Sequence, residues 1–433
     1  MKWNWFCPLP PAKTGIADYV TKILPSFGAH AELTLWTDQD EWDPSIARYG
    51  TVRRYDPACV PWSDLNRADL NIYHIGNHPD FHGGIWQVAR TCPGLVVLHD
   101  PSLHHFFGAL YRERGNMRSA YLQLMRRYYG EASMAVAVAF FDRAISTEFM
   151  AEHFPLTWHA LENALGVIVH SYKAFSELKA AERLPSAYIP LPYLPKNFVP
   201  PTNKPSRNDI MRIVVFGFLG RNRRLDQILQ AIAGLERRDR ICLEICGEVF
   251  DGKQTSALIA KLRLGEIVRL RGFLSDEDLE TVLSRSDLAL NLRYPSMGEA
   301  SLSQLRIWEH ALPTVVTQVG WYATLPEDAV CFVRPEQEIE DIQRHLNALL
   351  DDPERFERMG ERGRVLLETN HSPATYAKTL AEFATSLRGS TNVAIERLTE
   401  RAGHIAADWL GEDVDLAIFE NPARQILAAT GNE

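Results

Sequence analysis

The 433-residue chain lacks several features that would assign it to a class of protein at once. No stretch approaches the roughly 18 consecutive apolar residues that a membrane-spanning helix requires. Residues 1–8 are not expected to be a signal peptide, because their apolar run is too short and Pro8 breaks it. There is no low-complexity tract and no internal repeat. These absences favour a globular protein over an integral membrane protein.

The chain also has few cysteines and no excess of positive charge. Its six cysteines are scattered, and Cys242 and Cys246 lie four residues apart on the same face of one expected strand. We therefore expect buried free thiols in a reducing cytoplasm. The net charge of −9 and the isoelectric point near 5.9 argue against a nucleic-acid partner.

What the chain does have is an alternation of apolar, strand-like runs with helical patterns. Its length predicts two to three domains. Apolar strands between helices indicate parallel sheets covered on both faces, hence an α/β fold. The pattern restarts after the proline-rich segment 190–205, which we interpret as a linker between two doubly wound units. A first strand is expected before Pro10, and the further expected strands span residues 33–36, 70–75, 94–99, 166–170, 212–217, 242–246, 268–271, 288–292 and 314–316.

The most informative stretch follows the expected strand 288–292. It carries Arg293 and Glu299 in a loop, and a helix begins almost at once, with Ser301 and Gln304 spaced as a capping box. Glu299 therefore lies beside helix-terminal N–H groups, in a position that binds phosphate. A carboxylate next to an anion site suits a sugar that is attached to a diphosphate.

This stretch resembles the donor-site signature of the retaining family 4 glycosyltransferases of the GT-B fold, which belong to the group 1 glycosyl transferases. It is most similar to their branch with a Gly-Glu-Thr-Ser-Gly donor loop. The matching residues are Gly298, Glu299, Ser301, Arg306 and Pro313.

Three positions depart from the family pattern. Ala300 replaces the threonine of the loop, and Leu302 replaces its second glycine. Ile307 stands where family members commonly carry a second glutamate that holds the ribose, with Glu309 two residues later. The resemblance therefore leaves the ribose contact unassigned.

The resemblance covers about residues 1–388 and implies two facing Rossmann-like, doubly wound domains with a central cleft. Residues 1–200 would form the acceptor-binding domain, with a helical insertion at about 101–154. Residues 206–370 would bind the nucleotide sugar. Residues 371–433 would form C-terminal helices, the first of which crosses back to the N-terminal domain.

Several positively charged residues are candidates for the donor site. Arg223 and Arg224 follow the expected strand 212–217, and guanidinium groups bind phosphate oxygens in pairs. The resemblance places Arg223 where the family has a lysine that contacts the diphosphate. It also likens Arg271 and Phe273 to the segment that reads the donor base. The other donor contacts that it implies are Gly15, Arg293, Ala300, Ser301, Leu302 and Arg306.

Histidines follow two strands of the first domain. His99 ends the expected strand 94–99, where many family members carry a similar histidine that points at the sugar, so we treat it with Glu299 as catalytic. Asn77 and His78 are candidates for acceptor hydroxyls. A zinc site formed by His99, His104 and His105 is a weak alternative, because no carboxylate or thiolate supports it.

We expect no cofactor and no metal. Asp-x-Asp pairs occur at Asp276 and Asp278, in the first turn of a helix capped by Ser275, and again in the tail, at residues 413–415. The pair Asp38 and Asp40 follows a strand and is the one that could hold a metal.

The segment 111–130 of the insertion could make a peripheral membrane contact. It holds five arginines and one acid, together with Tyr121, Tyr128 and Tyr129. A basic, aromatic helix can lie on anionic lipid, although an ordinary packed helix explains the same pattern. The five arginines are Arg112, Arg114, Arg118, Arg126 and Arg127.

The sequence thus predicts a metal-independent, retaining hexosyltransferase. It would move a sugar from a UDP- or GDP-linked donor to a hydroxyl of a glycan, lipid-linked or small-molecule acceptor, in bacterial polysaccharide or glycoconjugate synthesis. We expect it in the cytoplasm or at the inner face of the membrane, without a nucleic-acid partner. The alternatives are a catalytically inactive GT-B sugar-binding or scaffolding protein, a GT-B epimerase, and a phosphorylase-like enzyme, for which no suitable lysine segment is present.

Overall fold

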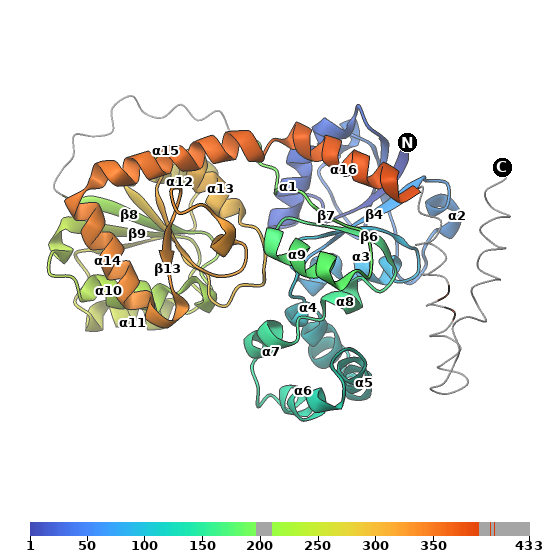
Figure 1. The fold of residues 1–433 in the computed structure, drawn as a ribbon, viewed down its shortest axis with the longest axis horizontal. Coiled ribbons are helices and arrows are strands. Elements are labelled where there is room, and N and C mark those ends of the chain that lie inside the picture. Colours follow the sequence, from blue (N-terminus) through green and yellow to red (C-terminus); the bar gives the residue numbers. More distant parts are fainter. Residues whose placement is uncertain (196–209, 389–398, 400–401, 403–433) are drawn as a thin grey trace. The chain divides into compact units, whose positions relative to one another are not determined.

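The computed structural model describes residues 1–195, 210–388, 399 and 402, and the chain forms two compact units (Figure 1). The first unit consists of Met1–Pro190 together with the chain from Pro373 onward. The second unit is Leu191–Ser372. Both are three-layer α/β structures with a purely parallel sheet, so the expectation of two doubly wound, Rossmann-like units is confirmed.

The first unit is built on a seven-stranded sheet with the strand order β3-β2-β1-β4-β5-β6-β7. Its central strands are apolar and buried on both faces, as parallel strands covered by helices must be. The strands are β1 (Lys2–Phe6), β2 (Glu32–Thr37), β3 (Thr51–Arg54), β4 (Leu70–Ile75), β5 (Gly94–Leu98), β6 (Ala164–Val169) and β7 (Ser186–Tyr188). The helices and helical turns are α1 (Gly15–Ile23), η1 (Leu24–Phe27), η2 (Pro44–Arg48), α2 (Trp62–Leu65), α3 (Pro79–Ala89), α4 (His104–Gly108), η3 (Ala109–Arg114), α5 (Arg118–Tyr129), η4 (Glu131–Ser133), α6 (Met134–Phe141), α7 (Thr147–His153), α8 (Thr157–Ala160), α9 (Tyr172–Ala181) and α16 (Pro373–Arg388).

The second unit has a six-stranded sheet with the order β10-β9-β8-β11-β12-β13. Its strands are β8 (Met211–Phe216), β9 (Ile241–Cys246), β10 (Val268–Gly272), β11 (Leu288–Asn291), β12 (Thr314–Thr317) and β13 (Cys331–Val333). The helices and helical turns are η5 (Arg221–Arg223), α10 (Leu225–Ala233), η6 (Arg238–Arg240), α11 (Gly252–Lys261), α12 (Asp276–Arg285), α13 (Leu302–Glu309), η7 (Tyr322–Thr324), η8 (Pro335–Gln337), α14 (Glu338–Asp351) and α15 (Pro353–Asn370).

The strand orders locate where each unit can bind a ligand. In an open parallel sheet, ligands bind outside the carboxyl ends of the strands at the point where the strand order reverses. That point lies between β1 and β4 in the first unit and between β8 and β11 in the second. The loops with Arg223 and Glu299 follow β8 and β11, so both leave the sheet at this switch point.

Helix α16 packs in the first unit although it follows α15 in the chain. It contacts α1, η1 and β6, and the hydroxyl groups of Tyr19 and Tyr376 are 2.6 Å apart. The expected boundary of the first domain, at residue 200, differs from the one in the structure. The segment Leu191–Tyr193 belongs to the second unit. The reason is local, because the Tyr193 backbone N–H donates to the His371 carbonyl at 2.8 Å.

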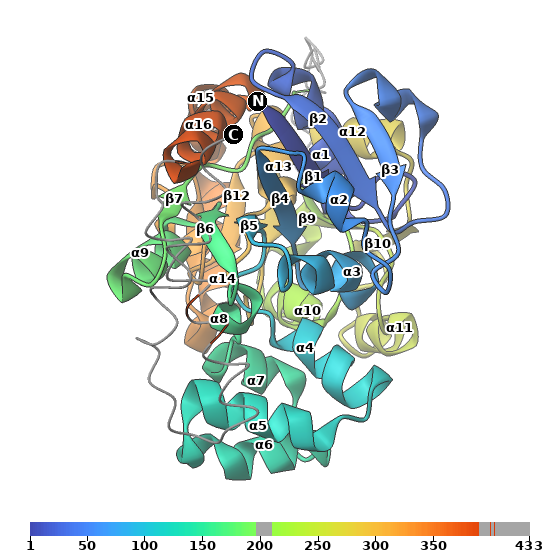
Figure 2. The same ribbon diagram turned by 90° about the vertical axis from the view of Figure 1, so that its right-hand side faces the viewer.

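The helical insertion of the first unit spans α4 to α7, whose helices lie together in Figure 2. Tyr121 and Met125 of α5 are fully buried, so the expectation that Tyr121 lies at a membrane interface is wrong. Tyr129 is half-buried and its hydroxyl accepts from the Leu156 N–H at 2.7 Å. The packed-helix alternative is the one that the structure supports.

The arginines of this segment are paired within the unit. Arg112 donates to the Phe140 carbonyl and lies over that ring, while an acid accepts from each of the other four. The acids are Asp80 for Arg114, Asp142 for Arg118, Glu131 for Arg126 and Glu162 for Arg127. Their charges are thus largely balanced by neighbouring acids. Within the described residues, no helix has the length and apolar character to cross a membrane.

Candidate active site

Arg223 is a nearly buried cation at the switch point of the second unit. It ends the turn η5, it is 7% exposed, and its Nη1 donates to the Asn291 side-chain oxygen at 2.7 Å. Its Nε has no hydrogen-bond partner, and no carboxylate of the described residues forms an ion pair with it. Burial lowers the pKa of the Arg223 guanidinium to about 10, and the charge of Arg293 acts in the same direction. A buried cation without a counter-ion is costly, so this geometry favours an anionic ligand.

Glu299 lies in the loop after β11 and is held by its own neighbours. Its carboxylate accepts from the Met297 N–H at 2.8 Å and the Ser296 hydroxyl at 3.3 Å, and Arg293 Nε lies 3.3 Å away. Gly298 has a φ of +82°, which favours glycine and allows the chain to turn around this carboxylate. The structure therefore brings Arg293 and Glu299 together. The charges of both side chains act on the pKa of Arg223.

The loops after β8 and β11 are tied to each other. The Tyr294 N–H donates to the Asn222 carbonyl at 2.8 Å, and the Arg293 N–H donates to the Thr317 hydroxyl at 3.0 Å. Arg223 and Glu299 are 76 residues apart in the chain. They thus lie on two hydrogen-bonded loops at the carboxyl ends of β8 and β11.

Helix α13 starts at Leu302 directly after the loop, with Ser301 as its N-cap. The Ser301 hydroxyl accepts from the Gln304 N–H at 3.1 Å, as the sequence predicted. The other half of the predicted capping box is wrong, because the Gln304 side chain is fully buried and bonds Asn291 and Thr314 instead. Ala300 lies in the loop just before the cap.

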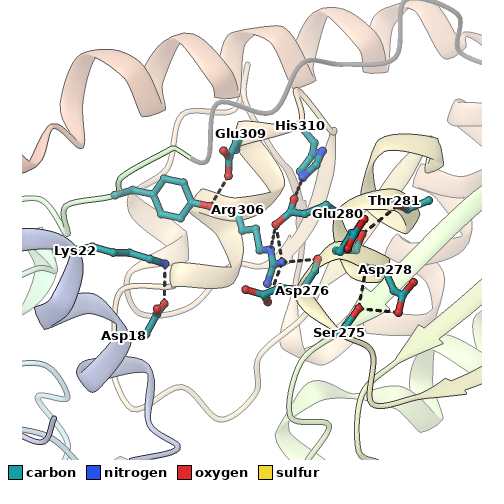
Figure 3. Close-up of polar contacts among 12 residues, drawn as sticks. Asp18, Lys22, Ser275, Asp276, Asp278, Glu280, Thr281, Arg306, Glu309 and His310 are labelled. Carbon is teal, nitrogen blue, oxygen red and sulfur yellow. Dashed lines mark hydrogen bonds and ion pairs between the residues drawn. The ribbon is translucent and has the colours of Figure 1, made fainter. Parts of the chain in front are cut away.

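Two predicted donor arginines are engaged in ion pairs. Arg224, with a φ of 58°, pairs with the buried Glu338 at 2.6 Å. Arg306 of α13 donates to Glu280 of α12 at 2.6 Å and lies 3.2 Å from Asp276 (Figure 3). These two side chains therefore form ion pairs that connect elements of the second unit, and they do not lie beside Arg223.

Two other candidates for the nucleotide site lie on and directly after β10. Arg271 is on the edge strand β10, 4.0 Å from Glu244, and Phe273 just beyond it is 87% exposed. Ser275 caps α12 by accepting from the Asp278 N–H at 3.1 Å, as predicted (Figure 3). The Glu309 carboxylate accepts from the Tyr193 hydroxyl at 2.5 Å.

In the first unit, His99 follows β5 and belongs to a group of aromatic side chains that includes His74 of β4, Tyr19 of α1 and His170, which follows β6. Its Nε2 lies 2.9 Å from His74 Nδ1, and its ring centroid is 5.2 Å from that of His170 and from that of Tyr19. Burial, followed by the charges of neighbouring histidines, lowers the pKa of His99 well below its usual range. His99 is thus a neutral imidazole at neutral pH, held by His74.

The remaining candidates of the first unit have local structural contacts. Gly15 is the first residue of α1, after the N-cap Thr14. The Asn77 side-chain oxygen accepts from the Phe106 N–H at 2.9 Å, and His78 is the exposed N-cap of α3. These contacts explain both residues without an acceptor.

Within the described residues, no group of three or more potential ligand side chains is close enough to hold an ion. His104 bonds the Phe154 carbonyl and the Tyr121 hydroxyl, and Asp40 pairs with Arg54. None of the six cysteines forms a disulfide in the part of the chain that the structure describes.

Sequence reasoning missed the residues that lie beneath the site. Asn291, Gln304 and Thr314 form a buried hydrogen-bonded chain that ends on Arg223. Tyr322 is also missed; its buried hydroxyl has no partner among the described residues, and its phenol is one of the groups that act on the pKa of Arg223. Asn291 ends a predicted strand, but nothing local marks the partners that it meets.

Comparisons with known proteins bear on the fold of the chain. Residues 202–366 match the model of the family described as Glycosyl transferases group 1. A sucrose-phosphate synthase from Thermosynechococcus elongatus aligns over 90% of this chain and 100% of its own, with a TM-score of 0.61 and 15% identity. HepE of Anabaena, solved in complex with UDP-glucose, aligns over 89% and 100%, with a TM-score of 0.57 and 14% identity.

The chain therefore has the GT-B fold, and the match to the glycosyl transferases group 1 model is confined to residues 202–366. A relative with a described activity is the MMP alpha-(1->4)-mannosyltransferase of Mycolicibacterium hassiacum, which is 29% identical over 147 residues. That match covers 32% of this chain and 34% of the relative, about a third of its length.

Proposed function

We propose that this protein is a retaining glycosyltransferase that moves a hexose from a nucleotide diphosphate donor to an acceptor hydroxyl. The observation that carries the proposal is the buried, carboxylate-free Arg223 beside the Arg293–Glu299 pair at the β8/β11 switch point. A diphosphate would supply the negative charge that this cation lacks.

In this proposal the diphosphate is the leaving group. Arg223 and the N–H groups at the start of α13 would neutralise the charge that develops on it, which needs no metal ion. Arg293 would contribute its own positive charge, since it pairs with the Glu299 carboxylate and its charge acts on Arg223. The departing phosphate would itself accept the acceptor proton, since the described site holds no second carboxylate beside Glu299.

Glu299 would hold hydroxyl groups of the transferred sugar. Its Oε2 accepts from the Met297 N–H and the Ser296 hydroxyl and its Oε1 faces Arg293, so its orientation is set before any ligand arrives. His99 would contact the sugar as a neutral donor or acceptor, because burial and the neighbouring histidines keep its pKa low. We propose that the reaction takes place in the cytoplasm with a glycan, lipid-linked or small-molecule acceptor.

The proposal leaves the donor base and the sugar open between UDP- and GDP-linked hexoses. The related protein of Mycolicibacterium hassiacum is named as a mannosyltransferase. HepE was solved in complex with UDP-glucose. Both kinds of donor share the diphosphate that Arg223 would bind.

A thermal-shift screen with a panel of UDP- and GDP-sugars tests the proposal, because a ligand that binds the native state raises the unfolding midpoint by mass action. At least one donor should stabilise the wild-type protein and fail to stabilise the Arg223→Ala variant. A sugar-binding scaffold would respond to free sugars instead, and stabilisation of both proteins alike would refute the role of Arg223.

A further inference from the structure

Arg223 differs from other arginines of the second unit in the chemistry of its partner. Arg224 pairs with the buried carboxylate of Glu338, and Arg306 pairs with Glu280. Arg223 is 7% exposed, yet its hydrogen-bond partner among the described residues is the neutral amide of Asn291, which is 3% exposed. A carboxamide satisfies one N–H of the guanidinium without cancelling its positive charge.

Asn291 is itself held by two further buried side chains. Its Nδ2 donates to Gln304 Oε1 at 3.0 Å, and Gln304 Nε2 donates to the Thr314 hydroxyl at 3.0 Å. The Thr314 hydroxyl lies 3.4 Å from the Leu312 carbonyl. Gln304 and Thr314 are both fully buried.

The direction of this chain of hydrogen bonds follows from Arg223. A guanidinium can only donate, so Asn291 must present its oxygen to it and its amide nitrogen to Gln304. Gln304 must then present its own nitrogen to Thr314, whose hydroxyl is left to donate to a carbonyl. The orientation of both amides is therefore determined, and Asn291 cannot rotate to offer its nitrogen to Arg223.

The chain also connects the elements that carry the site. Asn291 is the last residue of β11, Gln304 lies in α13, and Thr314 is the first residue of β12. The loop with Glu299 runs between the first two. The position of the Arg223 guanidinium is thus coupled to both ends of that loop.

We propose that Asn291, oriented by Gln304 and Thr314, is a positioning residue that holds the Arg223 guanidinium at the β8/β11 switch point and leaves its charge for the donor diphosphate. This inference rests on the proposed function and concerns the same anion site. It explains why the residue at this position is an amide: an aspartate of the same shape would be an internal counter-ion and would compete with the phosphate.

Asn291→Asp is the decisive variant, since it changes the charge and not the size of the partner. Gln304 can turn its amide to donate to the new carboxylate, and the Thr314 hydroxyl can then donate to Gln304. We expect the unfolding midpoint to stay level or rise, because Arg223 gains an ion pair, while the affinity for inorganic pyrophosphate, UDP and GDP falls at least tenfold. A purely structural role would not move stability and affinity in opposite directions.

The matched control is Asn347→Asp, because the Asn347 side-chain oxygen also accepts from an arginine, Arg237 Nη2, at 3.4 Å, but lies in α14. It should leave calorimetric affinities for the three probes unchanged. Gln304→Met provides a second variant if Asn291→Asp does not fold; by releasing Asn291 it should weaken pyrophosphate binding several-fold.

The outcomes separate this inference from the proposed function. If the wild-type protein binds the probes, Arg223→Ala does not, and Asn291→Asp binds within twofold of wild type, the inference is overturned and the proposed function stands. If the wild-type protein binds none of the three probes, both fail.

Discussion

At the scale of the residue, the charge of Arg223 is the central feature of this molecule. It combines near-complete burial with a neutral hydrogen-bond partner and a second arginine, Arg293, close enough to lower its pKa. Such a group is destabilising until an anion binds. Glu299 does not serve as its ion-pair partner, because that carboxylate faces Arg293 and two donors of its own loop.

Replacing Arg223 with alanine should weaken the binding of UDP or GDP by about 1.5–3 kcal/mol, the range for hydrogen bonds to a charged group. Arg223→Lys should recover much of this loss, since an ammonium also carries the charge. Isothermal titration calorimetry measures both. Arg285→Ala, at an exposed position at the end of α12, is the control and should bind as the wild type does.

Part of the site could be predicted from the sequence and part could not. Glu299, Arg293 and the Ser301 cap follow from short-range patterns, because a strand, a loop and a capped helix occupy consecutive residues. Asn291 and Gln304 could not be assigned, because their partners are set by tertiary packing. Gln304 shows the difference: the local pattern assigns its side chain to the cap, but burial and two long-range hydrogen bonds place it in the core.

At the scale of the element, helix α13 is tied to α12 by a small charged network. Glu280 of α12 accepts from Arg306 at 2.6 Å and from His310, which follows α13 (Figure 3). Burial raises the pKa of Glu280, but the His310 hydrogen bond and the Arg306 charge outweigh it and lower that pKa to about 2. The sequence predicted that Arg306 binds the donor. In the structure it stabilises α13, the helix that begins directly after the loop with Glu299.

This network makes a pH-dependent contribution to stability. A carboxyl whose folded pKa is lowered from 4.5 to about 2 contributes stability that is present above pH 4.5 and lost as the pH falls toward 2. Glu280→Gln should therefore cost roughly 2–3 kcal/mol at pH 7, and the difference from wild type should shrink below pH 4. Denaturant unfolding at several pH values measures this; Glu277→Gln, exposed on the same helix, should be neutral, and an equal cost at every pH would contradict the assignment.

At the scale of the whole molecule, the sequence predicts the two doubly wound units well, since their long apolar strands alternate with helices. The short strands β3, β7 and β13 were not expected, because three or four residues at a sheet edge carry too little pattern. The extent of the first unit also depends on contacts that no local pattern shows, such as the Tyr19–Tyr376 hydrogen bond that holds α16.

The two units should differ in their response to acid. Burial lowers the pKa of His74, His82, His99, His104 and His159 in the first unit and that of His345 and His371 in the second. A base with a lowered folded pKa contributes stability that is present above pH 6.5 and lost as the pH falls. For His82, lowered to about 4, the loss reaches about 2 kcal/mol at pH 5.

Calorimetric scans between pH 7 and pH 5 check this expectation. The unfolding midpoint of the wild-type protein should fall with acidification, and His82→Gln should make that fall shallower because one titrating group is removed. His153→Gln, at an exposed position, is the control. Parallel pH profiles for all three proteins would show that the buried histidine does not govern acid stability.

The most direct test of the account is the release of nucleoside diphosphate from UDP- and GDP-hexoses in the presence of EDTA, followed by mass spectrometry. Wild-type protein should release the diphosphate slowly from one donor without acceptor, and EDTA should not change the rate. Glu299→Ala should fold normally and lose turnover on the order of 100-fold, as expected for a group that acts at the reacting centre; Glu327→Ala, at an exposed position, should not. Release that requires Mg²⁺ or Mn²⁺, or equal release by wild type and Glu299→Ala, would contradict the account.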